Sequence, residues 1–391
     1  MTPAARVQAA IELLDGIVAA ARESGAAADT LIARYFKTRR YAGSKDRRAV
    51  RELVYRAIRR AGERPASGRA AMLGLAADEP ELRELFDGSA HGPAPPAADE
   101  PVAEASIAPA WLVDRFDPLI DTDERKALLA RAPLDLRVNR LNGDRAAALA
   151  SFPNAEPTPH SPLGLRLMEA IQVEQSEAWS SGLVEVQDEG SQLLCLACEA
   201  TPGMRVLDLC AGAGGKTLAL AAEMGNQGEI LASDTDRARL SRMPPRLARA
   251  GATIVETRLL DPGKEREALA GWEADLVLVD APCSGSGTWR RNPETRWRLT
   301  PERLARLVKL QADLLDVAAE HVRPGGHLVY AVCSLLADEG RDQAAAFGAR
   351  SSMVPVPLAI EVGRDAGPGR LLSPARDGTD GFFVARWRRP C

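Results

Sequence analysis

The second half of the chain alternates short apolar runs with stretches of helical length, and this alternation constrains the fold more than any other feature. From about Val184 onward, five runs are short enough for strands and apolar enough for buried ones. The runs are Arg205–Leu209, Glu229–Ser233, Ala252–Val255, Ala274–Val279 and His327–Val332. Strands that alternate with helices predict an α/β fold with a mostly parallel sheet.

The length of 391 residues is too great for one ordinary core, so we expect several domains. An all-helical domain is expected over residues 1–88, and a linker rich in Pro, Ala and Glu over residues 89–108. A small mixed α/β segment follows over residues 109–183, with a helix near Asp123–Ala130 and a strand at Asp135–Asn139. The α/β domain then covers residues 184–391.

A basic surface is expected on the helical domain. A helix near Asp46–Arg60 carries apolar residues on one face and cations on the others. The cations of this helix and of the stretch before it are Arg34, Lys37, Arg39, Arg40, Lys45, Arg47, Arg48, Arg51, Arg56, Arg59 and Arg60. The whole chain has a formal charge of −4, so nucleic-acid binding would depend on such a local patch. Phosphate binding and a merely solvated helix face both fit this pattern.

The lengths of the apolar runs and the spacing of the cysteines indicate whether a membrane span, disulfides or a metal site are expected. No run of about 18 apolar residues is present, so no membrane span is expected. Six cysteines in this length do not make a disulfide framework, and we expect free thiols and a cytoplasmic protein. Cys195 and Cys198 form a C-x-x-C inside an apolar helical run without a second ligand pair, which favours buried helix residues over a zinc site. No metal is expected.

A glycine-rich turn follows the first apolar run. Its residues are Cys210, Ala211, Gly212, Ala213, Gly214, Gly215 and Lys216, followed by Thr217. A P-loop would need its first glycine at Cys210, although Asp280 after an apolar run imitates the carboxylate of such enzymes. A dinucleotide fingerprint would need its third glycine at Thr217. Both patterns therefore match poorly.

S-adenosylmethionine fits this turn better because it carries no phosphate and needs only a close approach of the backbone. It also needs a carboxylate at the end of the next strand for its ribose hydroxyls. Asp234 stands at that place, and Asp261, a few residues past the third run, is placed to accept from the adenine amine. We therefore expect S-adenosylmethionine as the cofactor.

Two cysteines follow two of the predicted strands. Cys283 comes after Asp280-Ala281-Pro282, and Cys333 ends the fifth run. The carboxyl ends of parallel strands share one edge of the sheet, so both thiols are expected near Asp280 and the cofactor. A thiolate that adds to carbon 6 of a cytosine activates carbon 5 for methylation, provided the base is flipped out or single-stranded. The residues alone do not tell which cysteine attacks.

With these motifs in place, the chain resembles the Sun/Fmu-type RNA (cytosine-5) methyltransferases of the NOL/NOP/Sun family, in particular the bacterial 16S ribosomal RNA members. The matching motifs are Val186–Gln192, Cys210–Thr217, Asp280–Gly285, Arg291–Glu294, Cys333-Ser334 and Asp377–Phe383. The resemblance implies a Rossmann-like class I methyltransferase domain, with a NusB-like RNA-binding domain over residues 1–88.

The resemblance also assigns roles. It implies that Cys333 is the nucleophile, that Cys283 assists release of the product, and that Asp280 acts in catalysis. It implies cofactor contacts from Cys210 to Lys216 and from Asp234, Asp261 and Asp280. The expected partner of this monomeric enzyme is RNA, with 16S ribosomal RNA first and transfer RNA as the alternative. A P-loop NTPase and a non-catalytic RNA-binding module are the rival functions.

Overall fold

The computed structural model describes residues 1–23, 25–169 and 171–391, which divide into two compact units. Unit 1 contains residues 1–116, 121–130 and 284–304, and unit 2 contains residues 117–120, 131–283 and 305–391. The division does not follow chain order. Residues 284–304, which the sequence places within the α/β domain, cluster with the N-terminal helices, and so do residues 109–116 and 121–130.

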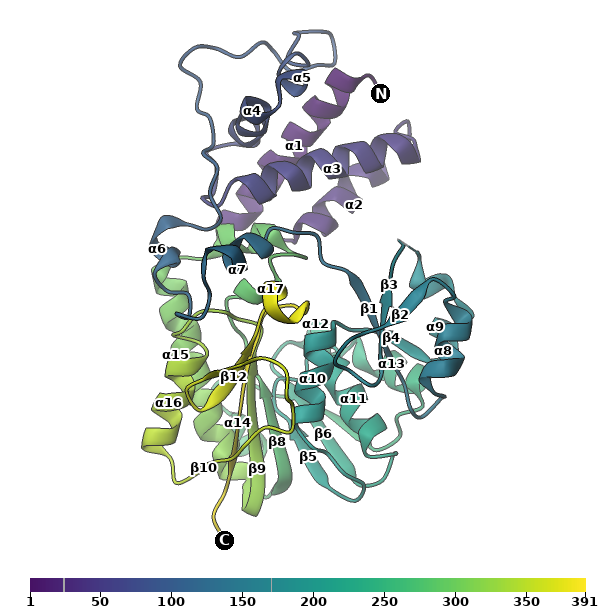
Figure 1. Cartoon of the computed structure of the whole chain (residues 1–391), viewed down its shortest axis with the longest axis vertical. Coiled ribbons are helices and arrows are strands. Elements are labelled where there is room, and N and C mark those ends of the chain that lie inside the picture. The colour runs from purple at the N-terminus through teal and green to yellow at the C-terminus, as the bar shows by residue number, and fades with distance from the viewer. Residues whose placement is uncertain (24, 170) are drawn as a thin grey trace. The chain divides into compact units, whose positions relative to one another are not determined.

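Unit 1 is a bundle of helices (Figure 1). Its helices are α1 (Pro3–Arg22), α2 (Ala28–Thr38), α3 (Ser44–Arg60), α4 (Gly68–Asp78), α5 (Pro80–Arg83), α6 (Ala110–Val113) and α7 (Thr122–Ala127). The helix α1 begins where Thr2 accepts a hydrogen bond from the Ala5 amide and Pro3 occupies the first turn. The apolar faces of α1, α3 and α4 form one core, in which Leu14, Ile58 and Met72 are fully buried.

Residues 89–108 form neither helix nor strand, but hydrogen bonds tie them to the helices. The Ala103 amide donates to the Ala70 carbonyl and the Ser106 amide to the Arg60 carbonyl, both at 3.0 Å. Glu100 forms an ion pair with Arg69 of α4. The stretch predicted as a linker is therefore a segment without helix or strand that is hydrogen-bonded to α3 and α4.

Unit 2 contains a small antiparallel sheet with the strand order β2-β3-β1-β4. The strands are β1 (Leu134–Val138), β2 (Ala155–Pro157), β3 (Gly164–Leu167) and β4 (Val184–Val186). The helices α8 (Arg145–Ser151) and α9 (Glu177–Ser180) and the 3₁₀ turn η1 (Val173–Gln175) accompany them. The strand β1 covers most of the strand predicted at Asp135–Asn139, because Leu136 and Val138 point into the core of this part.

The large sheet of unit 2 has the order β11-β12-β13-β9-β8-β5-β6-β7, and β10 pairs with β13. Its first five strands along the chain are β5 (Arg205–Asp208), β6 (Glu229–Asp234), β7 (Val255–Leu259), β8 (Ala274–Asp280) and β9 (Val322–Val332). These five are parallel, with β5 between β6 and β8 and with β9 beside β8. The mostly parallel α/β fold predicted from the sequence is thus confirmed.

The predicted third strand was wrong in its position. It was placed at Ala252–Val255, whereas β7 runs from Val255 to Leu259. Gly251 ends the preceding helix in the left-handed conformation, and the Ala252 amide still donates to the Leu247 carbonyl of that helix. The true strand was missed because it lies at the edge of the sheet and has exposed polar residues.

Four further strands complete the sheet: β10 (Val354–Pro355), β11 (Arg364–Ala366), β12 (Gly369–Leu372) and β13 (Phe382–Arg388). They pair in antiparallel fashion, and β13 lies beside β9 with Phe383 opposite Val332. The remaining helices are α10 (Glu189–Ala197), α11 (Gly215–Glu223), α12 (Arg237–Leu240), α13 (Met243–Ala250), α14 (Glu265–Ala268), α15 (Pro301–His321), α16 (Arg341–Arg350) and α17 (Pro374–Asp377).

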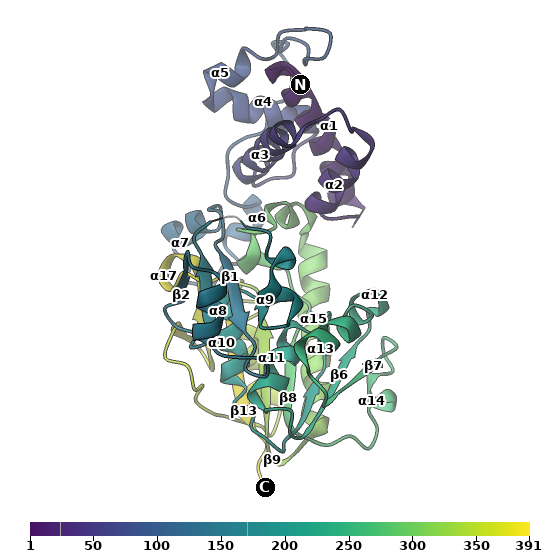
Figure 2. The ribbon, with the colours of Figure 1, turned by 90° about the vertical axis from the view of Figure 1, so that its right-hand side faces the viewer.

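One apolar core joins α10 and α11 to the large sheet. Leu193 and Leu194 of α10 and Leu220 of α11 pack with Val206 of β5 and Leu278 of β8. Figure 2 shows these two helices in front of the strands. Packing of α11 on the sheet fixes the turn between β5 and α11, which is the glycine-rich turn of the sequence. Among the helices of the described residues, none is long and apolar enough to cross a membrane.

Candidate functional site

The turn from Cys210 to Lys216 connects β5 to α11 with a backbone that only glycine adopts easily at two places. Gly212 and Gly214 have φ angles of 57° and 86°. A Cβ atom at Gly212 would lie 2.3 Å from the Arg239 guanidinium, and one at Gly214 would lie 2.7 Å from the Met243 side chain. The carbonyl of Ala213 accepts a hydrogen bond from Arg246. The turn is thus held closely against α12 and α13.

Asp234 lies at the end of β6, next to this turn. Its Oδ2 accepts from the Gly212 amide and its Oδ1 from the Asp236 amide, each at 2.7 Å. The side chain of Arg239 lies 3.7 Å away. Each carboxylate oxygen has a second lone pair, so Asp234 retains acceptor capacity toward ribose hydroxyls.

Asp261 lies just past β7 and is exposed. The Leu260 amide donates to the Asp234 carbonyl, which brings the start of this loop to the end of β6.

Lys216 and Asp280 form an ion pair across the carboxyl edge of the sheet, with 2.6 Å between Nζ and Oδ2. Burial acts to lower the pKa of Lys216, but the charge and hydrogen bond of Asp280, together with the charges of Cys195 and Cys333, outweigh it and the pKa is raised. A P-loop lysine would point at phosphates, and its following threonine at a magnesium ion. Here Lys216 faces Asp280, and the Thr217 hydroxyl donates to Asp208 at 2.7 Å. The geometry therefore disfavours an NTPase.

Asp208, at the end of β5, is fully buried. Burial raises the pKa of this carboxyl to about 7, while the hydrogen bond from Thr217 acts in the opposite direction. Its second oxygen, Oδ1, is buried without a hydrogen-bond partner within the described residues. A buried acceptor without a partner is costly, and the raised pKa of the carboxyl agrees with this environment, because a protonated carboxyl avoids a buried charge.

Cys283 and Cys333 come together although 50 residues separate them, and their sulfur atoms lie 3.4 Å apart. The cause is strand register, since β8 and β9 are parallel neighbours with Asp280 opposite Ala331. Both thiols are partly exposed. The charge of Cys333 is one of those that raise the pKa of Lys216, which means that the Lys216 ammonium group lies near this sulfur.

Two residues that the sequence did not single out as site residues hold the loops of the two cysteines. Gln311 of α15 donates to the Pro282 carbonyl at 2.9 Å and to Glu339 at 3.0 Å. Glu339, which is fully buried, also accepts from the Ser334 hydroxyl at 2.6 Å. Gln311 and the Glu339 carboxylate together thus connect Pro282, the residue before Cys283, with Ser334, the residue after Cys333.

The C-x-x-C pair behaves differently. Cys195 and Cys198 are buried in α10, and each thiol donates to the carbonyl four residues earlier. Burial raises the pKa of Cys195 to about 11 and that of Cys198 well above its usual value. Within the described part of the chain, no group of His, Cys, Asp and Glu is arranged to hold a metal ion.

Comparison with known proteins agrees with a methyltransferase site. Residues 195–388 match the model of the family described as 16S rRNA methyltransferase RsmB/F. Residues 195–388 are a methyltransferase domain of the RsmB/F family.

A curated relative, the ribosomal RNA small subunit methyltransferase B of Salmonella typhi, is 35% identical to this chain over 287 residues. The match covers 71% of this chain and 65% of that protein, which is less than two thirds of the relative's length.

Two solved structures have the same fold. The crystal structure of PH0851 superposes with a TM-score of 0.77 at 24% identity, covering 98% of this chain and 99% of its own. The structure of NSun6 from Pyrococcus horikoshii with SFG superposes with a TM-score of 0.66 at 20% identity, covering 72% and 98%. The likeness supports the Rossmann-like class I fold of the RsmB/F domain.

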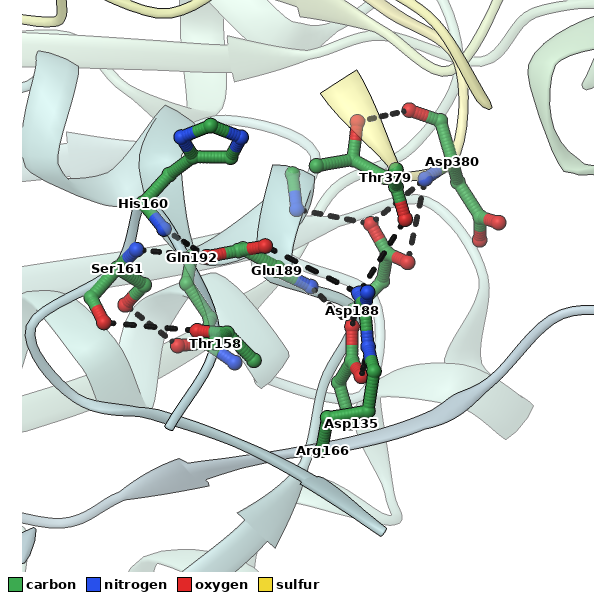
Figure 3. Close-up of polar contacts among 12 residues, drawn as sticks. Asp135, Thr158, His160, Ser161, Arg166, Asp188, Glu189, Gln192, Thr379 and Asp380 are labelled. Carbon is green, nitrogen blue, oxygen red and sulfur yellow. Dashed lines mark hydrogen bonds and ion pairs between the residues drawn. The ribbon is translucent and has the colours of Figure 1, made fainter. Parts of the chain in front are cut away.

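Two of the motifs that carry the resemblance form a polar cluster, shown in Figure 3. Glu189 accepts from the amides of His160 and Ser161 at 2.6 and 2.7 Å. Asp135 of β1 binds Arg166 through both oxygens, and Asp188 accepts from the Asp380 amide. These motif residues join the small sheet, α10 and the loop after α17. They hold the parts of unit 2 together.

Most of the cations predicted on the helical domain fall into two groups in unit 1. Four are in ion pairs: Arg39 with Glu12, Arg51 with Asp29, Arg56 with Glu79, and Arg60 with Asp78. The sequence missed these pairs because the carboxylates come from other helices. The exposed cations that no carboxylate pairs in the described residues include Arg34, Lys37, Arg40, Lys45 and Arg48. Tyr41, 73% exposed, lies in the same stretch.

Proposed function

We propose that this chain transfers a methyl group from S-adenosylmethionine to carbon 5 of a cytosine in RNA, through a covalent bond between Cys333 and the base. The observation that supports it most is the pair of thiols 3.4 Å apart beside the Lys216–Asp280 ion pair. A single thiol at a sheet edge would be unremarkable, but two thiols with a buried cation fit covalent catalysis.

The turn residues suit the cofactor. Gly212 and Gly214 give the turn its left-handed backbone between β5 and α11, and Asp234 keeps acceptor capacity at the end of β6. Bound there, S-adenosylmethionine would supply an electrophilic methyl group. NSun6 from Pyrococcus horikoshii, which has the same fold, was solved with SFG.

The chain's own residues would carry the remaining chemistry. Cys333, as a thiolate stabilised by the charge of Lys216, forms a bond to carbon 6 and makes carbon 5 nucleophilic. Asp280, held by Lys216, stabilises the adduct when it carries a proton that it donates to the ring nitrogen of the base. Carbon 5 takes the methyl group and gives its proton to a base, for which Cys283 in its thiolate form is placed, and the freed electron pair re-forms the double bond between carbons 5 and 6. The bond between sulfur and carbon 6 breaks, with Cys283 assisting this step and the Cys333 thiolate restored.

RNA as the substrate, with 16S ribosomal RNA first, is supported by the RsmB/F match and by the unpaired cations of unit 1. Exposed Arg and Lys side chains suit phosphates, and an exposed Tyr suits stacking with an unpaired base. We place the reaction in the cytoplasm and expect a monomer. No feature of the site favours transfer RNA over ribosomal RNA.

Bisulfite mapping of ribosomal and transfer RNA from cells with and without the gene tests the proposal. We expect one cytosine of 16S ribosomal RNA to lose its protection when the gene is absent. The purified full chain should restore it on RNA from those cells, with S-adenosylmethionine present. If protection is restored on transfer RNA alone, transfer RNA is the substrate. If no cytosine in either RNA depends on the gene for its protection, the proposed function is refuted.

A further inference from the structure

The segment that directly follows Cys283 is built into the helical unit. Residues 284–304 cluster with the N-terminal helices in unit 1. Their 3₁₀ turn η3 (Pro293–Arg298) carries Trp297, which is 2% exposed and packs in the core of the helices. The Trp297 indole donates to the Ala61 carbonyl at the end of α3, at 2.7 Å. The chain between β8 and α15 is thus part of a core and not a surface loop.

Glu294 of this turn caps the start of α2. The residue at the N-cap position is Ala27, which has no side chain to accept a hydrogen bond. The Ala28 amide donates instead to Glu294 Oε1 at 3.0 Å, and Glu294 is 1% exposed. A carboxylate at this end satisfies a free amide and interacts favourably with the helix dipole.

Arg296 caps the end of α3. Its guanidinium donates to the carbonyls of Ile58 and Arg59 in the last turn, and to that of Ile107. Arg296 is completely buried, and burial with the nearby charge of Arg59 lowers its pKa to about 9. It therefore still carries its charge at neutral pH. A cation at a helix C-terminus satisfies free carbonyls and complements the dipole.

We propose that the helical unit holds the chain after Cys283 in place, and that Glu294 and Arg296 are the positioning residues. The two helices lose their caps if the segment detaches, and the segment loses its anchors if the helices melt. The segment and helices α2 and α3 therefore open as one cooperative unit. Because Ser284 is bonded directly to Cys283, anchoring of this segment restrains the chain on the C-terminal side of Cys283, whose role in product release rests on the proposed function.

Hydrogen exchange on the full chain tests the anchoring without any RNA. In Arg296→Met and in the milder Glu294→Gln, which keeps an acceptor but loses the charge, amides of α2, α3 and residues 286–299 should exchange about tenfold faster together. Amides of β5 and β6 should not change. Arg56→Met is the matched control, since Arg56 lies in α3 but pairs with Glu79. Faster exchange in the helices with residues 286–299 unchanged would overturn the proposal.

A second readout concerns the release step. With RNA and S-adenosylmethionine, Arg296→Met and Glu294→Gln should form the adduct but release it slowly, so that a covalent complex persists on a denaturing gel. Release at the wild-type rate in both variants would refute the positioning role. If coupled exchange is seen but the wild-type chain forms no adduct with any RNA, the proposed function fails and the anchoring stands.

Discussion

The two cysteine pairs of unit 2 differ in almost every respect except composition. Cys195 and Cys198 are close in sequence, and both are buried in α10 with their thiols bonded to their own helix. Cys283 and Cys333 are far apart in sequence, yet their sulfurs lie 3.4 Å apart at the edge of the sheet, near a cation. The comparison teaches that strand register, and not spacing along the chain, brings reactive thiols together.

The difference in environment explains the difference in expected reactivity. The thiolate is the reactive form of cysteine, and an apolar environment disfavours it. Burial raises the pKa of Cys195 to about 11, so this thiol stays protonated at neutral pH. The pair at the sheet edge is partly exposed, so this burial effect does not hold both of its thiols in the protonated form to the same degree.

The largest effect is expected from Cys333→Ala. If Cys333 is the nucleophile, as we propose, its removal should lower methyl transfer by roughly a thousandfold or more and abolish the covalent adduct. Transfer of a radiolabelled methyl group to RNA measures the effect. Cys198→Ala is the matched control from the buried pair, and it should cost only about 1 kcal/mol of stability while turnover persists. Normal turnover in Cys333→Ala would show that Cys333 is not the nucleophile.

Cys283→Ala separates the two thiols of the reactive pair. The adduct through Cys333 should still form, but release should fail, so that one turnover leaves a covalent protein–RNA complex. A denaturing gel with labelled RNA detects it. If Cys283→Ala forms no adduct while Cys333→Ala does, the roles of the two thiols are exchanged.

A smaller effect is expected from Glu339→Gln, which weakens the support shared by the two cysteine loops. Hydrogen bonds to a buried charge are lost or weakened, and methyl transfer should fall about tenfold, mainly in kcat. Glu320→Gln, on the exposed Arg266 pair, is the control and should leave kcat unchanged. An unchanged kcat in Glu339→Gln would show that the loops are held without this carboxylate.

A further prediction concerns the stability of the protein as a function of pH. Burial raises the pKa of Asp208 to about 7, above the value of 3.8 for a free side chain. The folded protein then binds a proton that the unfolded chain has lost, so the contribution to stability is present below about pH 4 and is lost as pH rises toward 7. The free energy of unfolding should fall by at most about 1.4 kcal/mol per pH unit in this window. Denaturant unfolding at a series of pH values measures this. The free energy of unfolding should change less steeply with pH in Asp208→Asn than in the wild type, and an equal pH dependence would contradict the raised pKa of Asp208.

The sequence predicted much of the sheet because most strands are buried apolar runs, and chain order with parallel pairing implied a shared edge for Asp234, Asp280, Cys283 and Cys333. The strand β7 was misplaced because an edge strand can be polar. The link through Gln311 and Glu339 had no local signal, since its partners are brought together only by folding. The capping of α2 by Glu294 was invisible for the same reason, with 266 residues between its partners.

The hydrogen bond from the Gly212 amide to Asp234 has a consequence for the affinity of the proposed cofactor. The carboxylate expected to meet the ribose also holds the turn through the Gly212 amide, so we expect the turn to keep its conformation without a ligand. Little ordering is left to be done at the moment of association, so the entropic penalty is small and rigid-body docking suffices. Asp234→Ala would lose both contributions at once, and its affinity loss would therefore exceed that of a single missing hydroxyl contact.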